Sequence, residues 1–365
     1  MIIKTKNIVP FILIFLFVLP ASILAFIPIG MRPLYYYFIL LLDWFVILLF
    51  FKIIFLKKEN SFLTPFTLML IFTGLLGFFV KNDISLFNII FPILGFAGYK
   101  IIINERIEFP KLFNIYFFFL YLVFYNGYYS ILPDFFYRPG FNEDILNGAS
   151  SNAIPFSLNN SLLIYMALNF LYKWKASKSI LIIAIINLLL NIIQQGRGGI
   201  FVGVILLSIA FYEYAPMLFY RFRSVFILIY LYMIYISAVS IITYIDAVNI
   251  SDYSLLNETR IIAQLSFLNQ ITYSNFFFGF QENTWFDNEL YTYSMFLDFW
   301  NKYNFISFCV LIFLFLNRLY NYKKFLFPLY YLFPILFYSF LESIYLPGFY
   351  DFLVYLILFL PKNYR

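Results

Sequence analysis

The sequence predicts an all-α, polytopic membrane protein with about 12 transmembrane helices, in a single integral membrane domain that covers residues 1–365. Three observations predict this class. Hydrophobic residues make up 64% of the chain and charged residues only 12%, well below the roughly 25% that is usual in soluble domains. Apolar stretches long enough to cross the bilayer as helices recur along the whole chain. The basic residues also gather on alternate connections between these stretches.

The apolar stretches give the expected spans in chain order. The first follows Lys4 and Lys6 and extends to about Gly30 without a clear small-residue cleavage site. We therefore expect an uncleaved first span and not a signal peptide. The 12 expected spans are residues 9–30, 34–56, 62–80, 84–103, 112–132, 153–172, 178–194, 199–215, 223–245, 299–317, 325–343 and 348–360.

The positions of the basic residues give the orientation of these spans. With the N-terminus in the cytoplasm, 18 of the 24 Lys and Arg residues lie on the inner side, as the positive-inside rule predicts. Both termini are then cytoplasmic, and the net charge of +6 reflects topology and does not indicate a nucleic-acid partner. The six basic residues on the outer side are Arg32, Lys81, Arg138, Arg197, Arg260 and Lys302.

The rare residue types exclude several kinds of chemistry. The chain has no histidine, so a histidine base, a histidine metal ligand and a histidine pH switch are excluded together. The single cysteine, Cys309, lies inside an apolar run and excludes an intramolecular disulfide. No metal cluster is recognisable, and we expect neither a metal nor a cofactor.

Two large loops, at residues 133–152 and 246–298, lie on the outer side, whereas the inner loops are short and basic. Elaborated loops tend to carry function, so the expected active face is extracytoplasmic. Within the second loop, Ile261–Gln270 has apolar residues at helical spacing. This spacing predicts a short helix that lies along the membrane surface.

An arginine flanked by glycines stands at the outer start of the span 199–215. The amides and the positive dipole end of this helix face the outer side, and glycines let a backbone approach a phosphate closely. A guanidinium stays charged and binds phosphate oxygens in pairs. The segment therefore predicts a site for a phosphate or pyrophosphate, formed by Gln195, Gly196, Arg197, Gly198 and Gly199.

Simpler explanations of these residues remain open. Gly199 and Gly203 form a G-x-x-x-G pair, which often indicates only close helix packing. Arg197 could be an interfacial anchor. Arg260, a second outer arginine in the large loop, could be a partner of Glu258.

Carboxylates near the end of the second outer loop are the candidate general bases. A carboxylate can accept the proton of a sugar hydroxyl when its pKa is raised. Because a solvated loop normally carries several acidic residues, the sequence does not decide between them. The candidates are Glu289, Asp287 and Asp298.

Over about residues 180–320, the pattern resembles bacterial O-antigen polymerases, the oligosaccharide repeat-unit polymerases related to O-antigen ligases. It consists of Arg197-Gly198-Gly199 after a span, Arg260 in a large outer loop, an N-x-x-x-G-like turn at Asn275–Gly279, and Asp287-Asn288 before the next span. The resemblance implies a C-type glycosyltransferase-like architecture. It also implies that Arg197 and Arg260 match the family's two outer arginines.

The expected reaction is polymerisation of lipid-linked repeat units of O-antigen or capsule. A polyprenyl-pyrophosphate-linked glycan would move onto the non-reducing-end sugar of another lipid-linked unit, without a metal. Outside the cytoplasmic membrane there is no nucleotide sugar, so the donor must carry its own activated bond. Two arginines can stabilise its leaving group electrostatically. The expected partners are the lipid-linked donor and acceptor, membrane lipid and a chain-length regulator, in the bacterial cytoplasmic (inner) membrane.

The chain departs from this pattern at two positions. The ligases carry a histidine in the second loop, where this chain has Asp287 or a neighbouring residue. With no histidine in the chain, polymerase is favoured over ligase, which is kept as a second alternative. Asn304, and not a glycine, occupies the turn after Lys302-Tyr303, which leaves the identity of the base open.

The first alternative is a transporter, such as a 12-span lipid-linked oligosaccharide flippase. Transporters place polar residues at mid-membrane on broken helices, often in two related halves. Here Asp43 is the main intramembrane carboxylate, and no half-repeat is visible. The candidate residues gather instead in the outer loops, which favours the polymerase.

Overall fold

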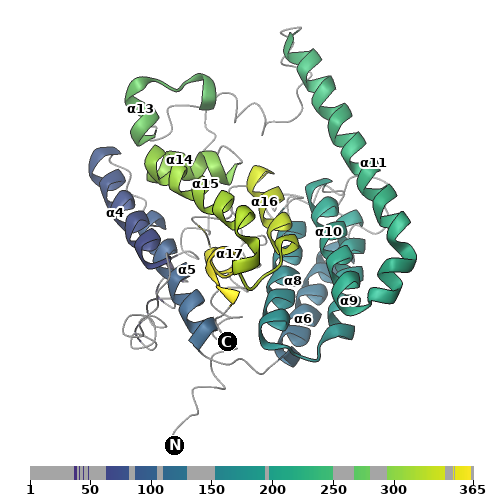
Figure 1. Cartoon of the computed structure of the whole chain (residues 1–365). Coiled ribbons are helices and arrows are strands. Elements are labelled where there is room, and N and C mark those ends of the chain that lie inside the picture. The colour runs from purple at the N-terminus through teal and green to yellow at the C-terminus, as the bar shows by residue number, and fades with distance from the viewer. Residues whose placement is uncertain are drawn as a thin grey trace, which may run out of the picture.

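A computed structural model describes the following residues of the chain: 37, 38, 41, 44, 48, 63–81, 87–104, 110–129, 153–193, 197–249, 267–279, 294–341, 348 and 350–362. Within these residues the chain is helical, without a β-strand, and an isolated antiparallel bridge joins Phe325 to Pro361. The expected all-α class is confirmed at this level (Figure 1). In the same residues, no helix has both the length and the apolar character that a membrane crossing requires.

From residue 63 to residue 249, the helices follow the expected apolar stretches to within a few residues, except that α11 starts earlier. The bounds of α8 are the expected 153–172, because polar or charged residues flank the apolar run at both ends. The expected spans 9–30 and 34–56 and the outer loop 133–152 lie outside the described residues, apart from the five single positions before residue 63. These helices are α4 (Leu63–Lys81), α5 (Phe87–Asn104), α6 (Pro110–Tyr129), α8 (Ala153–Tyr172), α9 (Ser177–Ile193), α10 (Arg197–Tyr214) and α11 (Pro216–Asn249).

The C-terminal third is more broken than the sequence predicts. The expected span 299–317 is two helices, and the expected span 325–343 begins with a 3₁₀ turn. The loop 246–298 is also shorter, since α11 reaches Asn249 and the next long helix starts at Met295. The elements are α13 (Tyr273–Phe278), α14 (Met295–Tyr303), α15 (Phe305–Tyr320), η7 (Tyr322–Lys324), η8 (Leu329–Tyr331), α16 (Leu332–Leu341) and α17 (Asp351–Phe359).

Asn304 causes the break between α14 and α15. Its backbone has φ 82° and ψ 168°, a region that L-residues with a side chain rarely occupy. The Asn304 N–H still donates to the carbonyl of Trp300, which ends α14. Its side-chain oxygen accepts from the N–H of Ser307 at 2.9 Å, which starts α15. One residue therefore ends one helix and caps the next.

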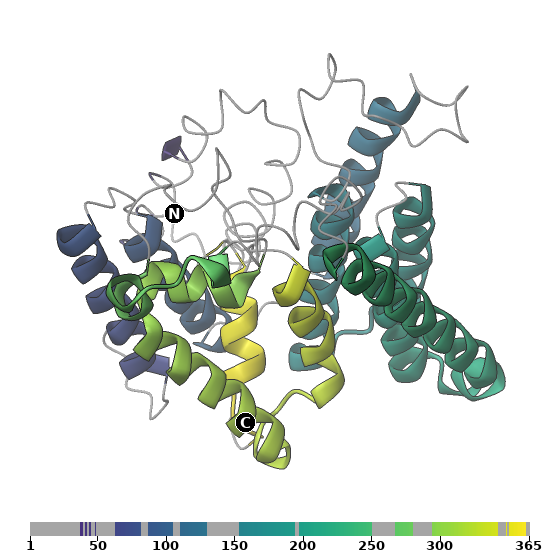
Figure 2. The same ribbon diagram turned by 90° about the horizontal axis from the view of Figure 1, so that it is seen from above.

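The helices surround a short, fully buried element. All residues of α17 are buried, and it packs against α5, which in turn packs against α4. On the other side of the molecule, α10 packs against α8, α9 and α11. The helix α16 contacts both α10 and α14 (Figures 1 and 2). It is therefore one of the elements that connect these two parts of the fold; α8 is another, since its Tyr172 hydroxyl donates to the carbonyl of Ile102 in α5.

Candidate functional site

The helix α10 begins at Arg197, so the Arg197-Gly198-Gly199 sequence forms its first turn, close to the expected start at Gly199. First-turn N–H groups have no acceptor within their own helix, and the positive dipole end lies there. This is the arrangement that the sequence predicts for anion binding. Nothing further is described for the side chain of Arg197.

Gly199 and Gly203 both allow close packing of neighbouring helices. A Cβ atom at Gly199 would lie 2.3 Å from Cβ of Pro155 in α8. At Gly203 it would lie 2.8 Å from Nδ2 of Asn191 in α9. Close packing, the simpler explanation of this glycine pair, therefore accounts for both residues without a ligand. Gly198 is only half-buried.

Two buried asparagines hold the carbonyl group of Gly199. Nδ2 of Asn159 donates to this oxygen at 2.9 Å, and Nδ2 of Asn191 donates to it at 3.2 Å. Asn191 also donates to Oδ1 of Asn159 at 2.8 Å, and Asn159 donates to the hydroxyl of Tyr338 at 2.8 Å. Both asparagines are 0% exposed. We call Asn159, Asn191 and Tyr338 the asparagine network; it joins α8, α9, α10 and α16.

The other side of α16 contacts the helix that carries Asp298. The residue after Tyr338, Ser339, donates its hydroxyl proton to the carbonyl of Ile335 in its own helix at 2.7 Å, and the same Oγ lies 3.3 Å from Sδ of Met295. The carbonyl of Ser339 accepts from Oγ of Ser294 at 3.5 Å. Met295 begins α14, and Asp298 lies in the first turn of that helix, 3% exposed. Of the three candidate bases, Asp298 is the one that the structure describes. It places this carboxylate in a helix and not in a solvated loop.

A second buried carboxylate, Asp351, was not singled out from the sequence. It is 0% exposed at the start of α17, and its Oδ1 accepts from the N–H of Gly348 at 2.8 Å. A Cβ atom at Gly95 would lie 2.5 Å from Cβ of Asp351, so that glycine makes room for it. The Pro-Gly sequence just before a carboxylate and a final apolar run is the signal that could have identified it.

Aromatic rings connect the two buried regions. The ring of Phe156, next to Pro155, lies 4.9 Å from the ring of Tyr338 and 5.6 Å from the ring of Tyr350. Tyr350 directly precedes Asp351. The first turn of α10, the C-terminal end of α16 and the start of α17 therefore form one packed region.

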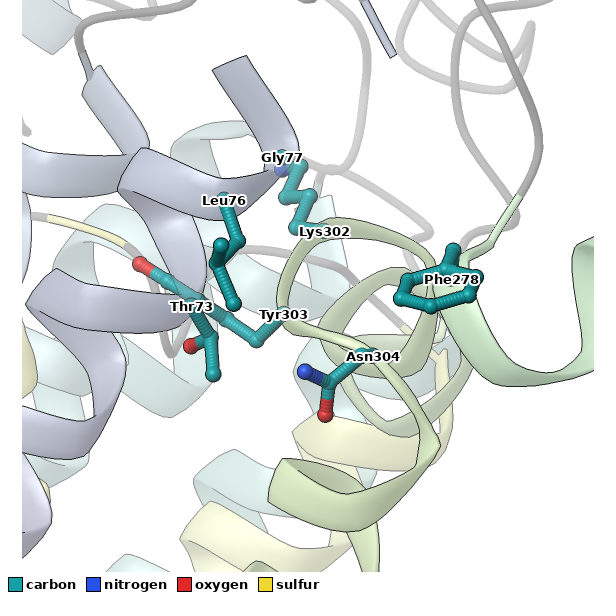
Figure 3. Close-up of a pocket in the computed structure, with 7 residues that line it drawn as sticks. All are labelled: Thr73, Leu76, Gly77, Phe278, Lys302, Tyr303 and Asn304. Carbon is teal, nitrogen blue, oxygen red and sulfur yellow. The ribbon is translucent and has the colours of Figure 1, made fainter. Parts of the chain in front are cut away.

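A shallow hollow lies beside α14, between α4 and α13 (Figure 3). Its empty volume is about 220 Å³, including the part that is open to the outside. Lys302, one of the six expected outer basic residues, extends along its edge toward Gly77, and Phe278 faces it from the opposite wall. The hollow is lined by Thr73, Leu76, Gly77, Phe278, Lys302, Tyr303 and Asn304.

The end of the expected second outer loop is anchored on α14 and α15. Residues 267–269, at the end of the expected surface helix, are helical, and Phe267 is buried against Trp300 with ring centroids 5.8 Å apart. The expected turn at Asn275–Gly279 is wrong for residues 275–278, which belong to the next helix, α13; the chain leaves this helix at Gly279, which has φ 79°. Nε1 of Trp300 donates to the carbonyl of Phe276 in α13 at 2.7 Å. These contacts bring part of the loop to the same end of α14 as the hollow.

Several predicted site residues cannot be compared with the structure. Gln195, Gly196, Arg260, Asp287 and Glu289 lie outside the described residues. A meeting of Arg197 with Arg260 stays a prediction. Among the residues that the structure does describe, no group of three or more His, Cys, Asp or Glu is placed to hold a metal ion.

The chain was also compared with known proteins. No protein-family model matches it, and no curated protein and no solved structure is significantly similar to it.

Proposed function

We propose that the chain is a polytopic protein of the bacterial inner membrane with a C-type glycosyltransferase-like architecture. The composition supports this, since 64% of the residues are hydrophobic. Large apolar side chains also face outward on several helices, among them Leu68, Phe72, Phe118, Phe119 and Leu228. Soluble monomers rarely expose extended apolar surfaces of this kind, and a lipid environment would cover them.

We infer that the protein polymerises lipid-linked oligosaccharide repeat units. The observation that carries this proposal is the connection of two elements through α16. One is the first turn of α10, which holds Arg197 and amides that have no acceptor within their own helix. The other is α14, which holds the buried carboxylate of Asp298. The first element suits a pyrophosphate, and the second suits a base that accepts a hydroxyl proton.

The proposed transfer needs these two kinds of group. The acceptor hydroxyl oxygen forms a bond to the anomeric carbon of the donor, whose bond to the pyrophosphate oxygen breaks. The hydroxyl proton passes to a carboxylate, for which Asp298, Asp287 and Glu289 are the candidates. The leaving polyprenyl pyrophosphate takes the electron pair, and its negative charge is stabilised by Arg197 and Arg260. No step requires an oxidant or a reductant.

The test is complementation of a deletion strain with variants at matched expression. Arg197→Ala should abolish the polysaccharide ladder on a gel, because the leaving group loses a fixed positive charge. Arg223→Ala is the matched control, since Arg223 is exposed near the start of α11 and should leave the ladder intact. A complete ladder from Arg197→Ala would show that the proposed mechanism is wrong.

A flippase is the second candidate function, because the break at Asn304 interrupts an expected span. Discontinuous helices are a feature of transporters. A flux assay with a labelled lipid-linked repeat unit in proteoliposomes separates the two functions. Translocation without chain growth would favour the flippase, and chain growth without translocation would favour the polymerase.

A further inference from the structure

We propose that Asn159 and Asn191 are positioning residues, which fix the first turn of α10 relative to α16 and so to the helix of Asp298. This inference rests on the proposed function for its catalytic consequence. The placement itself is independent of that function and can be measured separately. The argument starts from the Gly199 carbonyl, on which both asparagine side chains converge.

The first turn of α10 would be loose without external bonds. It contains Gly198 and Gly199, and glycine is the most flexible residue and a poor helix former. The N–H groups available to an anion lie in this same turn. Their direction is therefore defined only if the turn is held by its neighbours. The amide groups of Asn159 and Asn191 do this from α8 and α9.

Because Asn159 and Asn191 are buried, the presence of an amide at these two positions needs a physical reason. An amide group buried among apolar side chains is unfavourable unless it is hydrogen-bonded, and any apolar residue could fill a helix interface. Both amide nitrogens donate two hydrogen bonds each, and three of these four bonds lie within the group of Asn159, Asn191 and Gly199. The missing side chain at Gly203 is what lets Asn191 reach this position.

Tyr338 connects the first turn of α10, which the asparagines position, to α16. Asn159 donates to its hydroxyl, and the next residue, Ser339, reaches the start of α14: its Oγ contacts Sδ of Met295, and its carbonyl accepts from Oγ of Ser294. A displacement of the Gly199 turn would therefore change the position of α16 relative to α14. In the proposed reaction, this is the spacing between the pyrophosphate and the base. A misplacement of about 1 Å can lower a rate by about 100-fold.

Kinetics of the purified protein in proteoliposomes test the catalytic consequence, with a lipid-linked repeat unit as donor and acceptor. Asn159→Leu keeps the approximate volume and removes the amide, and we expect kcat to fall by about 100-fold with KM changed by less than about twofold. Tyr338→Phe keeps the ring against Phe156 and removes the hydroxyl. Its kcat should fall less, by about tenfold, and it serves if Asn159→Leu does not fold.

Asn169→Leu is the matched control. Asn169 lies on the same helix, is also buried, at 4% exposed, and donates to a tyrosine hydroxyl, that of Tyr214, at 2.9 Å. Like Asn159→Leu, the Asn169→Leu variant should lower thermal stability, but its kcat per folded protein should be unchanged. If Asn169→Leu and Asn159→Leu lower kcat equally, the role of Asn159 is structural and the proposal is overturned.

A distance measurement tests the placement without catalysis. Nitroxide labels at Ile192 and Phe340, which are 49% and 60% exposed, report the distance from α9 to α16 by double electron–electron resonance in a Cys309→Ser background. Asn159→Leu should broaden or shift the distribution, and Asn169→Leu should not. An unchanged distribution in Asn159→Leu overturns the inference. If the wild-type chain forms no polymer while Asn159→Leu shifts the distance, the proposed function fails and the positioning of α10 remains.

Discussion

Gly199→Ala adds a single methyl group where the structure has the least room for it near the proposed site. The new Cβ would lie 2.3 Å from Cβ and 3.1 Å from Cγ of Pro155, whereas ordinary contacts begin at 3.4 Å. The proline ring is rigid and part of α8, so the two helices must separate by about 1.1 Å, the difference between these contact distances. Overpacking of this kind typically costs about 1–3 kcal/mol. We also expect a fall in rate on the order of 100-fold, because the turn that holds Arg197 moves by about 1 Å.

The assay compares thermal unfolding in detergent and polymer formation in proteoliposomes for four variants. Gly199→Ala should lose both stability and rate. Gly203→Ala should lose less, because its new Cβ meets the movable side-chain ends of Asn191 and Leu188. The double variant Pro155→Gly/Gly199→Ala removes the clash and should restore a large part of the rate. The Pro155→Gly single variant completes the double-mutant cycle. Wild-type stability and rate in Gly199→Ala alone would refute the packing argument.

Four further variants have defined outcomes. Asn304→Gly relieves a backbone conformation that costs about 1–3 kcal/mol, but it also removes the side chain that caps Ser307. We expect the free energy of unfolding, measured by chemical denaturation, to rise by a net amount of about 1 kcal/mol. Asp298→Asn should lower kcat by at least about 100-fold if Asp298 is the base, whereas Asp351→Asn should mainly lower the melting temperature; the reverse result would exchange their roles. Arg318→Met removes a buried guanidinium that donates to the carbonyls of Ile357 and Phe327. The free energy of unfolding should fall by about 3 kcal/mol, which a lower melting temperature would report.

Sequence periodicity identified the helices of the middle of the chain because an apolar run ends where polar residues begin. The first residue of α10 lies two positions from the expected start, and α8 has the expected bounds. The apolar pattern predicted an unbroken span over 299–317, and only the resemblance placed a turn at Asn304, since a positive φ at asparagine depends on tertiary contacts and leaves the apolar pattern unchanged. At that turn, the chain has Asn304 where the family that it resembles has a glycine.

The contacts of the candidate site could be predicted only in part. Arg197 and Asp298 were recognised because charge is rare in this chain and both lie at expected span ends. Asn159 and Asn191 were missed because asparagine is common in the sequence, and nothing local distinguishes a buried amide from an exposed one. Tyr338 is one of 33 tyrosines. Its role depends on which helix faces it, and a single sequence does not report which helices are neighbours.

The two halves of the proposed site depend on the rotation of α16 about its own axis. Tyr338 and Ser339 are consecutive, and consecutive side chains on an α-helix differ in direction by about 100°. The first therefore points toward Asn159 and the second toward Met295, so α16 is held by a hydrogen bond to α8 on one side and by the contacts of Ser339 with Met295 and Ser294 on the other. Apolar packing alone would leave several rotations of similar energy, whereas a buried polar group is satisfied in one of them. A rotation by one residue would break these contacts together. The relative position of the α10 turn and the Asp298 helix therefore depends on this pair of residues as well as on the aromatic packing around them.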